Sequence, residues 1–328
     1  MALIRRIAFS LALLSHALCA GAQQPGKVPR IGVLHPGSSS EASSVQRDPF
    51  EKGLRELGWK PGSTILIDYR YGEGNPAQLA KQAASLASSG VDVIVARSDT
   101  AIAAAQQATS TIPIVMSAGT EDPAIVKNLS RPRGNVTGIT VPIYTLDSKR
   151  LELLKDAFPA VRRVAVITNP NFDSGRFEAN NAALEASARS LKVEVRLFLV
   201  RRADEVPAVF RELSSAGFDA LLVRPDPLVL DHQRHELAAL AAKHRLPAVY
   251  PWRFFVDAGG IMSYAVSLSG FHYRAATYVN RILKGEKPAD LPIEQPTQFE
   301  LAVNLAASRT QGLTIPQAVI FRADYLIQ

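Results

Sequence analysis

Two hydrophobic patterns alternate along the chain from Arg30 onward. Short apolar runs rich in β-branched residues are separated by longer stretches in which apolar side chains recur every three or four positions. The first pattern predicts buried strands, and the second predicts helices packed on the faces of a parallel sheet. Strands are predicted at 30–35, 64–71, 91–96, 112–116 and 134–140. Helices are predicted to end at 57, to open at 75–76, and to span 99–109 and 146–158.

The second half of the chain repeats the first. RVAVITNPN resembles RIGVLHPG, FDALLVRPD resembles VDVIVARSD, and LPAVYP resembles IPIVMS. The paired segments start at Arg30 and Arg163, at Val91 and Phe218, and at Ile112 and Leu246. An offset of about 130 residues between like segments predicts two α/β lobes of one design, with coincidence among apolar strands as the alternative.

The N-terminus has the three parts of a secretory signal. Arg5 and Arg6 precede an apolar run that is too short to span a membrane, and small residues follow at Ala20 to Ala22. We predict cleavage after Ala22, with 1–22 as the signal peptide and the periplasm as the destination. The single cysteine, Cys19, lies inside this segment, so the mature chain is expected to hold no disulfide and no thiolate metal site.

Length and charge narrow the class of protein. A chain of 328 residues usually forms two domains. The net charge of +7 falls to +5 without the two arginines of the signal, and it is spread along the chain. This distribution does not favour a nucleic-acid partner. No later apolar run reaches 18 residues, so we expect a soluble mature protein.

Candidate ligand contacts follow the predicted strands of the first half, because open parallel sheets bind ligands beyond the carboxyl ends of their strands. The first candidates are Ser98, Asp99 and Thr100, which can either cap a helix or present its N-terminus to an anion. The others are His35, Ser38 and Ser39 in a loop that could close over a solute, and Gly119 and Thr120, where glycine lets the backbone approach a ligand.

In the second half, Asn169 and Asp226 end corresponding strands. Asp226 suits a ligand ammonium group, and the alternative is a helix cap or an ion pair with Arg224. Three aromatic residues, Tyr250, Trp252 and Tyr264, can stack on a ligand or belong to the core.

Other motifs are weaker. The sequence Gly72 to Ala77 fits a dinucleotide fingerprint, but it follows the second strand, and Pro76 lacks the N–H that a phosphate needs. His232 and His235 are better explained as a solvated polar helix face than as metal ligands. No nucleophile motif occurs, so we expect a protein that is not an enzyme and that needs no cofactor or metal.

Several motifs together resemble the substrate-binding proteins of ABC importers, specifically the TrpX-like family with the type I periplasmic-binding fold. The motifs are GLRELGW at 53–59, IPIV at 112–115 with Asp122-Pro123, GNVTG at 134–138, YPW at 250–252, GGIMSY at 259–264, KGEKP at 284–288 and GLTIP at 312–316.

The resemblance implies two doubly wound parallel-sheet lobes joined by a three-segment hinge, with crossings near Thr140, Ala265 and Glu300. The N-terminal lobe is expected at 28–140 plus 266–299, and the C-terminal lobe at 141–265 plus 300–328. The implied function is the periplasmic solute-binding component of an ABC importer, a monomer that binds an amino acid or an aromatic or carboxylate solute and delivers it to an inner-membrane permease. A sensory ligand-binding protein, a periplasmic hydrolase and a repressor of the same design are the alternatives.

Overall fold

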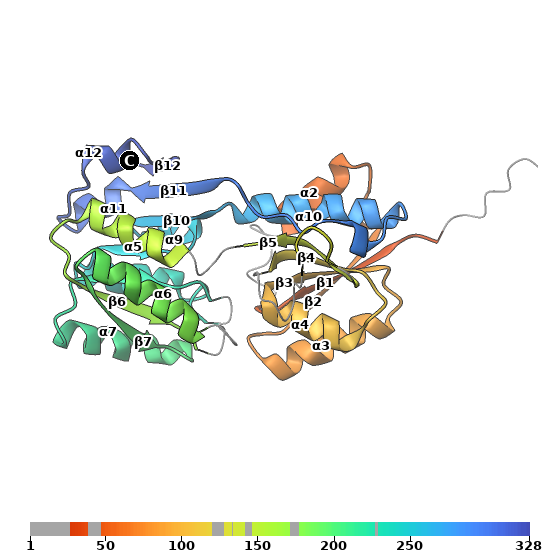
Figure 1. Ribbon diagram of the computed structural model, residues 1–328, viewed down its shortest axis with the longest axis horizontal. Coiled ribbons are helices and arrows are strands. Elements are labelled where there is room, and N and C mark those ends of the chain that lie inside the picture. The colour runs from red at the N-terminus through yellow and green to blue at the C-terminus, as the bar shows by residue number, and fades with distance from the viewer. Residues whose placement is uncertain are drawn as a thin grey trace, which may run out of the picture.

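The computed structural model describes residues 27–38, 47–119, 128–132, 134–141, 146–170, 177–226 and 229–328. The predicted signal peptide 1–22, Ser39 and Thr120 lie outside these residues. Within them, no helix has the length and hydrophobicity needed to cross a membrane. Figure 1 shows two α/β lobes side by side, the first on the right and the second on the left.

The first lobe contains a five-stranded parallel sheet in the order β2-β1-β3-β4-β5. Its strands are β1 (Arg30–His35), β2 (Leu66–Tyr71), β3 (Val93–Arg97), β4 (Ile114–Gly119) and β5 (Val136–Thr140). Helices α2 (Asp48–Glu56) and α10 (Leu268–Leu283) cover one face, and α3 (Pro76–Ser88) and α4 (Ser98–Ala108) cover the other. The central strands β3 and β4 are therefore buried on both faces and are mostly apolar, whereas the edge strand β2 is partly exposed and carries Asp68 and Arg70.

The second lobe contains a seven-stranded sheet in the order β12-β11-β10-β9-β8-β6-β7, in which only β10 and β11 run antiparallel. Its strands are β6 (Arg163–Thr168), β7 (Glu194–Leu199), β8 (Ala220–Val223), β9 (Ala248–Tyr250), β10 (Met262–Val266), β11 (Phe299–Asn304) and β12 (Tyr325–Ile327). Its helices are α5 (Leu146–Ala157), α6 (Phe177–Ser190), α7 (Val206–Ser215), α8 (Arg234–Lys243), α9 (Arg253–Asp257), α11 (Leu305–Thr310) and α12 (Gln317–Ile320). Two 3₁₀ turns span Ala203–Glu205 and Pro288–Asp290.

The predicted internal repeat is confirmed by strand order. The order β7-β6-β8-β9-β10 in the second sheet corresponds to β2-β1-β3-β4-β5 in the first. In both sheets the first strand of the lobe therefore lies between the second and the third. The chain reverses its winding direction between β1 and β3 and again between β6 and β8, and such reversal points are where doubly wound sheets form ligand crevices.

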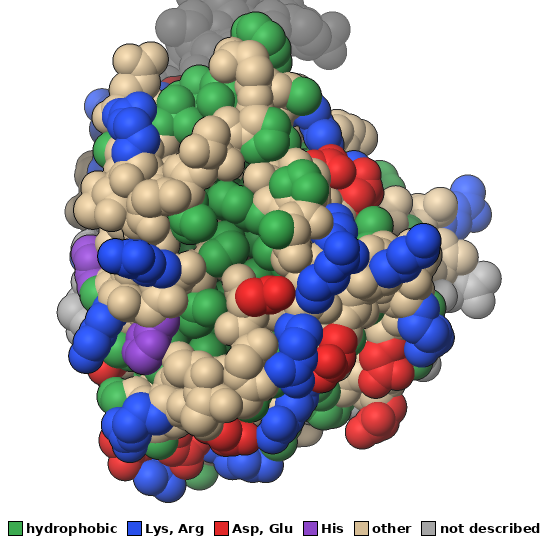
Figure 2. All heavy atoms as spheres, turned by 90° about the vertical axis from the view of Figure 1, so that its left-hand side faces the viewer, with side chains coloured by type: hydrophobic (Ala, Val, Ile, Leu, Met, Phe, Trp, Pro, Cys, Tyr) green, Lys and Arg blue, Asp and Glu red, His purple; other side chains and the backbone are tan. Residues whose placement is uncertain are grey.

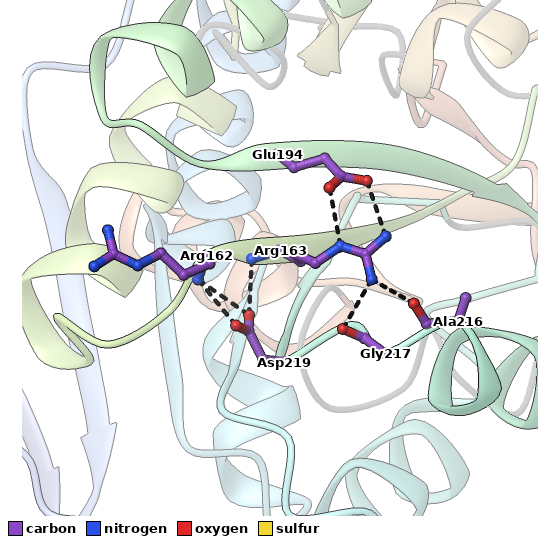
Figure 3. A network of polar contacts seen from close by, with 6 residues as sticks. All are labelled: Arg162, Arg163, Glu194, Ala216, Gly217 and Asp219. Atoms are coloured by element: carbon purple, nitrogen blue, oxygen red, sulfur yellow. Dashed lines mark hydrogen bonds and ion pairs between the residues drawn. The ribbon is translucent and has the colours of Figure 1, made fainter.

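The same set of hydrogen bonds, which we call the polar clasp, joins the amino ends of the strands in both lobes. In the first lobe, Arg30 N–H donates to Asp92 at 2.8 Å, and the Arg30 guanidinium donates to the Ser89 carbonyl. In the second lobe, Arg163 N–H donates to Asp219 at 2.9 Å, and its guanidinium donates to the carbonyl oxygens of the α7 C-terminus (Figure 3). The same two residue types thus hold the same place in both lobes.

Local sequence features set the helix ends. The Asn75 side chain accepts hydrogen bonds from the N–H groups of Ala77 and Gln78 and caps α3, as the Asn-Pro pair predicts. Gly58, at φ 91°, follows α2 in the left-handed region that glycine adopts without strain. Gly138, at φ 126°, leaves no room for a side chain, since a Cβ there would lie 2.3 Å from the Met116 carbonyl oxygen.

The chain passes between the lobes after β5, after β10 and before β11 (Figure 1). Helix α10 follows a strand of the second sheet but packs on α2 and β4 of the first lobe. Strand β11 then returns to pair with β10.

Figure 2 shows the end of the second lobe that faces away from the first, where a central group of hydrophobic side chains is surrounded by polar side chains, with lysine and arginine among them.

Candidate functional site

The carboxyl ends of β1 and β3 lie opposite the segment before α8 of the second lobe, and we call the boundary between the lobes at this point the cleft. Gly37, just after β1, lies against His232, just before α8, and a Cβ on Gly37 would come 3.1 Å from the His232 ring. Arg97, at the end of β3, interacts electrostatically with Asp231 of the second lobe. These contacts involve the winding-reversal points of the sheets, so the cleft lies where a doubly wound fold places its ligand.

His35 and Arg97 bridge the reversal point of the first lobe. Arg97 Nη1 lies 2.7 Å from His35 Nε2, and the Gly37 N–H donates to His35 Nδ1 at 2.9 Å. Both ring nitrogens thus face N–H donors, whereas a neutral imidazole can accept only one hydrogen bond. Burial and then the Arg97 charge lower the pKa of His35 well below its ordinary value, so the ring is neutral.

A narrow pocket opens between these residues and helices α2 and α10. Its polar lining comprises His35, Arg47, Tyr69, Arg97, Ser117 and His272, and its apolar lining includes Val33 and Val95. His272 Nε2 and Arg47 Nε are buried and have no hydrogen-bond partner among the described residues. Burial and then the Arg97 charge lower the pKa of His272 to about 3, so this ring is neutral as well.

Ser98, Asp99 and Thr100 form the first turn of α4 at the same edge of the sheet. Ser98 is buried at φ 71°, a left-handed conformation that serine rarely adopts. Its Oγ lies 2.9 Å from the Thr100 hydroxyl and accepts weakly from the Ala101 N–H at 3.5 Å. Backbone strain of this kind concentrates at functional sites, because the surrounding fold must hold it in place.

Gly119 has a packing explanation that involves no ligand. It ends β4, and a Cβ there would lie 2.7 Å from Ile102 Cδ1 of α4 and 3.0 Å from Met116 Sδ. Close packing of α4 on the sheet is sufficient to explain this glycine, and the approach of its backbone to a ligand stays a prediction. Ser38 is half-buried in the loop after β1, whereas Ser39 and Thr120 lie outside the described residues.

In the second lobe, Asn169 and Asp226 meet at the reversal point. Asn169 Nδ2 donates to Asp226 Oδ2 at 3.0 Å, and the N–H groups of Val229 and Leu230 donate to the same oxygen. Asp226 has no exposed surface. This geometry is the capping alternative, and it corrects the assignment of Asp226 as a direct ammonium ligand, because the carboxylate holds a turn of its own chain.

Asp231 lies at the end of that turn and was missed. The sequence predicted a solvated polar helix face for 231–236, but Asp231 is only 7 % exposed and precedes α8. Its carboxylate accepts from the Asp226 N–H at 3.4 Å. Burial raises the pKa of Asp231 to about 7, and the nearby Asp226 also raises it, while Arg97 across the cleft lowers it.

Arg224, two residues before Asp226, does not pair with it. Its guanidinium donates instead to Asp147 Oδ2 and to the side-chain amide oxygen Asn181 Oδ1, each at 2.7 Å. Asp147 also accepts from Arg150 at 2.8 Å, and all three charged side chains are at most 2 % exposed. The network is a buried ion cluster inside the second lobe.

The three aromatic candidates occupy different environments. Tyr250 has no exposed surface and stacks on Phe255 at 5.0 Å, so its assignment to the ligand site was wrong and it belongs to the core. Trp252, 4 % exposed, has a buried Nε1 without a partner among the described residues. Tyr264 is half-buried and stacks on Phe299 near the hinge.

The sequence did not predict the roles of Arg97 and His272 on the first-lobe side of the cleft, nor that of Asp231 on the second-lobe side. One signal could have found Arg97. The repeat aligns VDVIVARSD with FDALLVRPD and so places Arg97 opposite Arg224, directly after corresponding strands. His272 lies on α10, which reaches the site only through the return of the chain to the first lobe.

Comparisons with known proteins agree with this architecture. A family model described as ABC transporter substrate binding protein matches residues 31–327. A tyrosine-binding protein of Clostridioides difficile (strain R20291) is 26 % identical over 280 residues, which cover 84 % of this chain and 79 % of that protein.

Among solved structures, an ABC domain in complex with L-Trp from Streptococcus pneumonia has a TM-score of 0.82 at 25 % identity, covering 92 % of this chain and all of that one. A leucine-binding protein from Thermotoga maritima has a TM-score of 0.59 at 14 % identity, covers 78 % of this chain and 83 % of its own length, and shows the fold alone. The predicted type I periplasmic-binding fold is confirmed, and the chain belongs to the family of ABC transporter substrate binding proteins.

Proposed function

We propose that this protein is an exported receptor that binds an amino acid or an aromatic carboxylate in the cleft and delivers it to the permease of an ABC importer. The family match supports the transport role. Two similar proteins are described as binding tyrosine and L-Trp, which supports an amino-acid ligand. The segment 1–22 would direct the chain to the periplasm.

The observation that carries the proposal is the pair of opposite charges across the cleft. Arg97 from the first lobe and Asp231 from the second interact electrostatically, but they are too far apart to form an ion pair with each other. Both are mostly buried yet keep some exposed surface, 8 % and 7 %. An α-amino acid has a carboxylate and an ammonium group on one carbon, so it matches two opposite charges that face each other over a short gap.

The remaining candidates surround this pair. Ser98, Asp99 and Thr100 lie directly after Arg97, where the Ser98 and Thr100 hydroxyl groups can form hydrogen bonds with the ligand. Asn169 and Asp226 brace the turn that presents Asp231. We therefore assign Asp226 to positioning, and we retain His35, Ser38, Ser39, Thr120, Trp252 and Tyr264 as proposed contacts.

The ligand would act by stabilising the closed arrangement of two bodies, 28–140 with 266–299 and 141–265 with 300–328. The segments between them are the hinge, and the closed monomer is the form that the permease would recognise. The role requires no chemical step by the protein itself, so we infer that it is not an enzyme.

The test is equilibrium binding to the mature chain by calorimetry and thermal shift, with L-tryptophan, L-tyrosine, L-leucine and 3,4-dihydroxybenzoate as probes. At least one should raise the melting midpoint and bind in a 1:1 ratio. Asp231→Asn should weaken binding of the amino acids, whereas Asp257→Asn on exposed α9 should not. If no amino acid or aromatic acid binds even at high millimolar concentration, the proposal fails.

A further inference from the structure

We propose that the pocket beneath Arg97 is a subsite for a carboxylate group of the ligand, with Arg97 and His272 as its donors. This inference rests on the proposed receptor function and names the chemical class of solute that the receptor takes. It also names the lobe that binds the solute first, because every group of the pocket comes from the first lobe.

Within the described part of the first lobe, Arg97 is a buried positive charge without a counter-ion. Arg97 is 8 % exposed, and its one hydrogen bond to a described residue is the contact with the neutral His35 ring. No carboxylate lines the pocket among the described residues. Glu51, the acid nearest to Arg47, accepts from the Tyr69 hydroxyl and pairs with Arg55 at 2.6 Å. Buried charges are normally paired, so the site lacks an anion.

The pocket beneath Arg97 has more hydrogen-bond donors than its acceptors can satisfy. His35 already faces two N–H donors and can accept from only one of them. In the same pocket, His272 Nε2 and Arg47 Nε are buried and have no partner in the part of the chain that the structure describes. A carboxylate brings two oxygens that accept several hydrogen bonds without donating any, so one group would satisfy the donors that the protein leaves open.

The internal repeat allows the surroundings of Arg97 to be compared with those of Arg224 in the second lobe. Arg224 holds the place of Arg97 in the second lobe, and there the chain provides the carboxylate itself, through Asp147 at 2.7 Å. Arg150 of α5 completes that cluster, and His272 of α10 completes the one around Arg97. Among the described residues, the two lobes thus build the same cationic position, but only the second supplies its own acid.

The size of the pocket limits what enters it. The enclosed space is about 30 Å³, room for a small polar group rather than for an aromatic ring. The carboxylate group of a larger acid would enter the pocket, and the rest of the ligand would stay in the cleft near Ser98 and Asp231. Inorganic phosphate offers similar charge in a tetrahedral shape, so the experiment must separate the two anions.

The experiment compares L-tryptophan with L-tryptophanamide by calorimetry, since the amide keeps the ring and the ammonium group and loses only the carboxylate charge. Wild-type protein should bind the acid about 10- to 100-fold more tightly than the amide, as expected for charge-assisted hydrogen bonds. If L-tryptophan is not a ligand, 3,4-dihydroxybenzoate and its methyl ester form the second pair of probes.

Arg97→Met should abolish the preference for the acid and bind both compounds weakly. His272→Phe should reduce the preference and Ser117→Leu, which fills the pocket, should reduce it further. Arg196→Met is the matched control, because Arg196 pairs with Glu212 on the exposed surface of the second lobe. Circular dichroism should show each variant folded, and Ser117→Leu tests the pocket without changing any charge.

The outcomes are separable. Equal affinity for acid and amide, or an unchanged preference in Arg97→Met, overturns the carboxylate subsite and leaves the receptor function standing. Phosphate that displaces the acid from wild-type protein but not from Arg97→Met overturns the assignment to an organic carboxylate. Failure of every acid, amide and ester to bind overturns the subsite together with the receptor proposal.

Discussion

Arg97 and Arg224 occupy corresponding places in two repeated lobes, yet their surroundings differ. Arg224 is bound within its lobe by Asp147 and Asn181 at 2.7 Å each. Arg97 contacts a neutral histidine, lines a pocket, and senses a carboxylate only across the cleft. A buried cation that the fold neutralises is structural, whereas a buried cation left for another molecule to neutralise marks a binding site.

The difference arises from the helices that follow the hinge. Helix α5 enters the second lobe with Asp147 in its first turn, and both Arg150 and Arg224 donate to that acid. Helix α10 enters the first lobe and presents His272, which burial keeps neutral, to Arg97. Asp147 on α5 therefore accounts for the difference between the two sites: it neutralises the cluster around Arg224, whereas the described residues place no acid beside Arg97 within its own lobe.

The largest effect is expected on removing the shared acid of the second lobe. Asp147→Ala leaves two buried guanidinium groups without a counter-ion, which typically costs about 3–5 kcal/mol of unfolding free energy. Urea denaturation followed by circular dichroism measures this loss. A change below about 1 kcal/mol would show that Asp147 does not neutralise the cluster, and the contrast with Arg97 would disappear.

The carboxylate across the cleft predicts a dependence on pH. The pKa of Asp231, about 7, is above its ordinary value of 3.8, so the folded protein holds a proton that the unfolded chain releases between these values. Stability should therefore fall as pH rises through this window, by at most about 1.4 kcal/mol per pH unit, and the loss should be complete above pH 7.

Asp231→Asn should remove this slope when melting is measured from pH 4 to 8. An ammonium ligand favours the ionised carboxylate, so its affinity for wild-type protein should rise with pH over the same range. Identical pH profiles for wild-type protein and the variant would contradict the buried position of Asp231.

Arg97→Met should have a small effect on the ligand-free protein. Removing a buried cation that lacks an ion pair can be neutral or stabilising, so we expect unfolding free energy to remain within about 1 kcal/mol of wild type. Arg224→Met, measured beside it, should be clearly destabilising because it leaves Asp147 with one guanidinium partner fewer. Equal losses in the two variants would show that both arginines are structural.

The smallest effect is expected at the exposed clasp of the second lobe, drawn in Figure 3. Glu194→Gln removes the ion pair with the Arg163 guanidinium at the sheet edge. The pair is exposed, so solvent and salt screen it, and the melting midpoint should not change measurably. A marked decrease in the melting midpoint would indicate that Arg163 needs Glu194 in addition to Asp219 and the α7 carbonyl groups.

Most of the fold follows from local patterns in the sequence. The strands at Arg30–His35 and Val136–Thr140, and the helix that starts at Leu146, agree closely with prediction. Hydrophobic periodicity reports which side of an element is buried, and the repeat reports that two lobes share a design. The resemblance to a known family added the return of α10 to the first lobe, which periodicity does not contain.

The site was predicted less well, because strand ends locate an edge but not the direction of each side chain. Tyr250, Gly119 and Asp226 all lie at strand ends, yet they serve the core, helix packing and a turn. Arg97 is separated by more than a hundred residues of sequence from both Asp231 and His272, and no local pattern links the three.

The sequence by itself determined the alternation of strands and helices, the duplication and the edge where ligands belong, because these depend on spacing between near neighbours. The tertiary structure decided which buried charges find partners. That outcome depends on which distant helix packs on each strand end: α5 brings an acid to Arg224, and α10 brings a neutral histidine to Arg97.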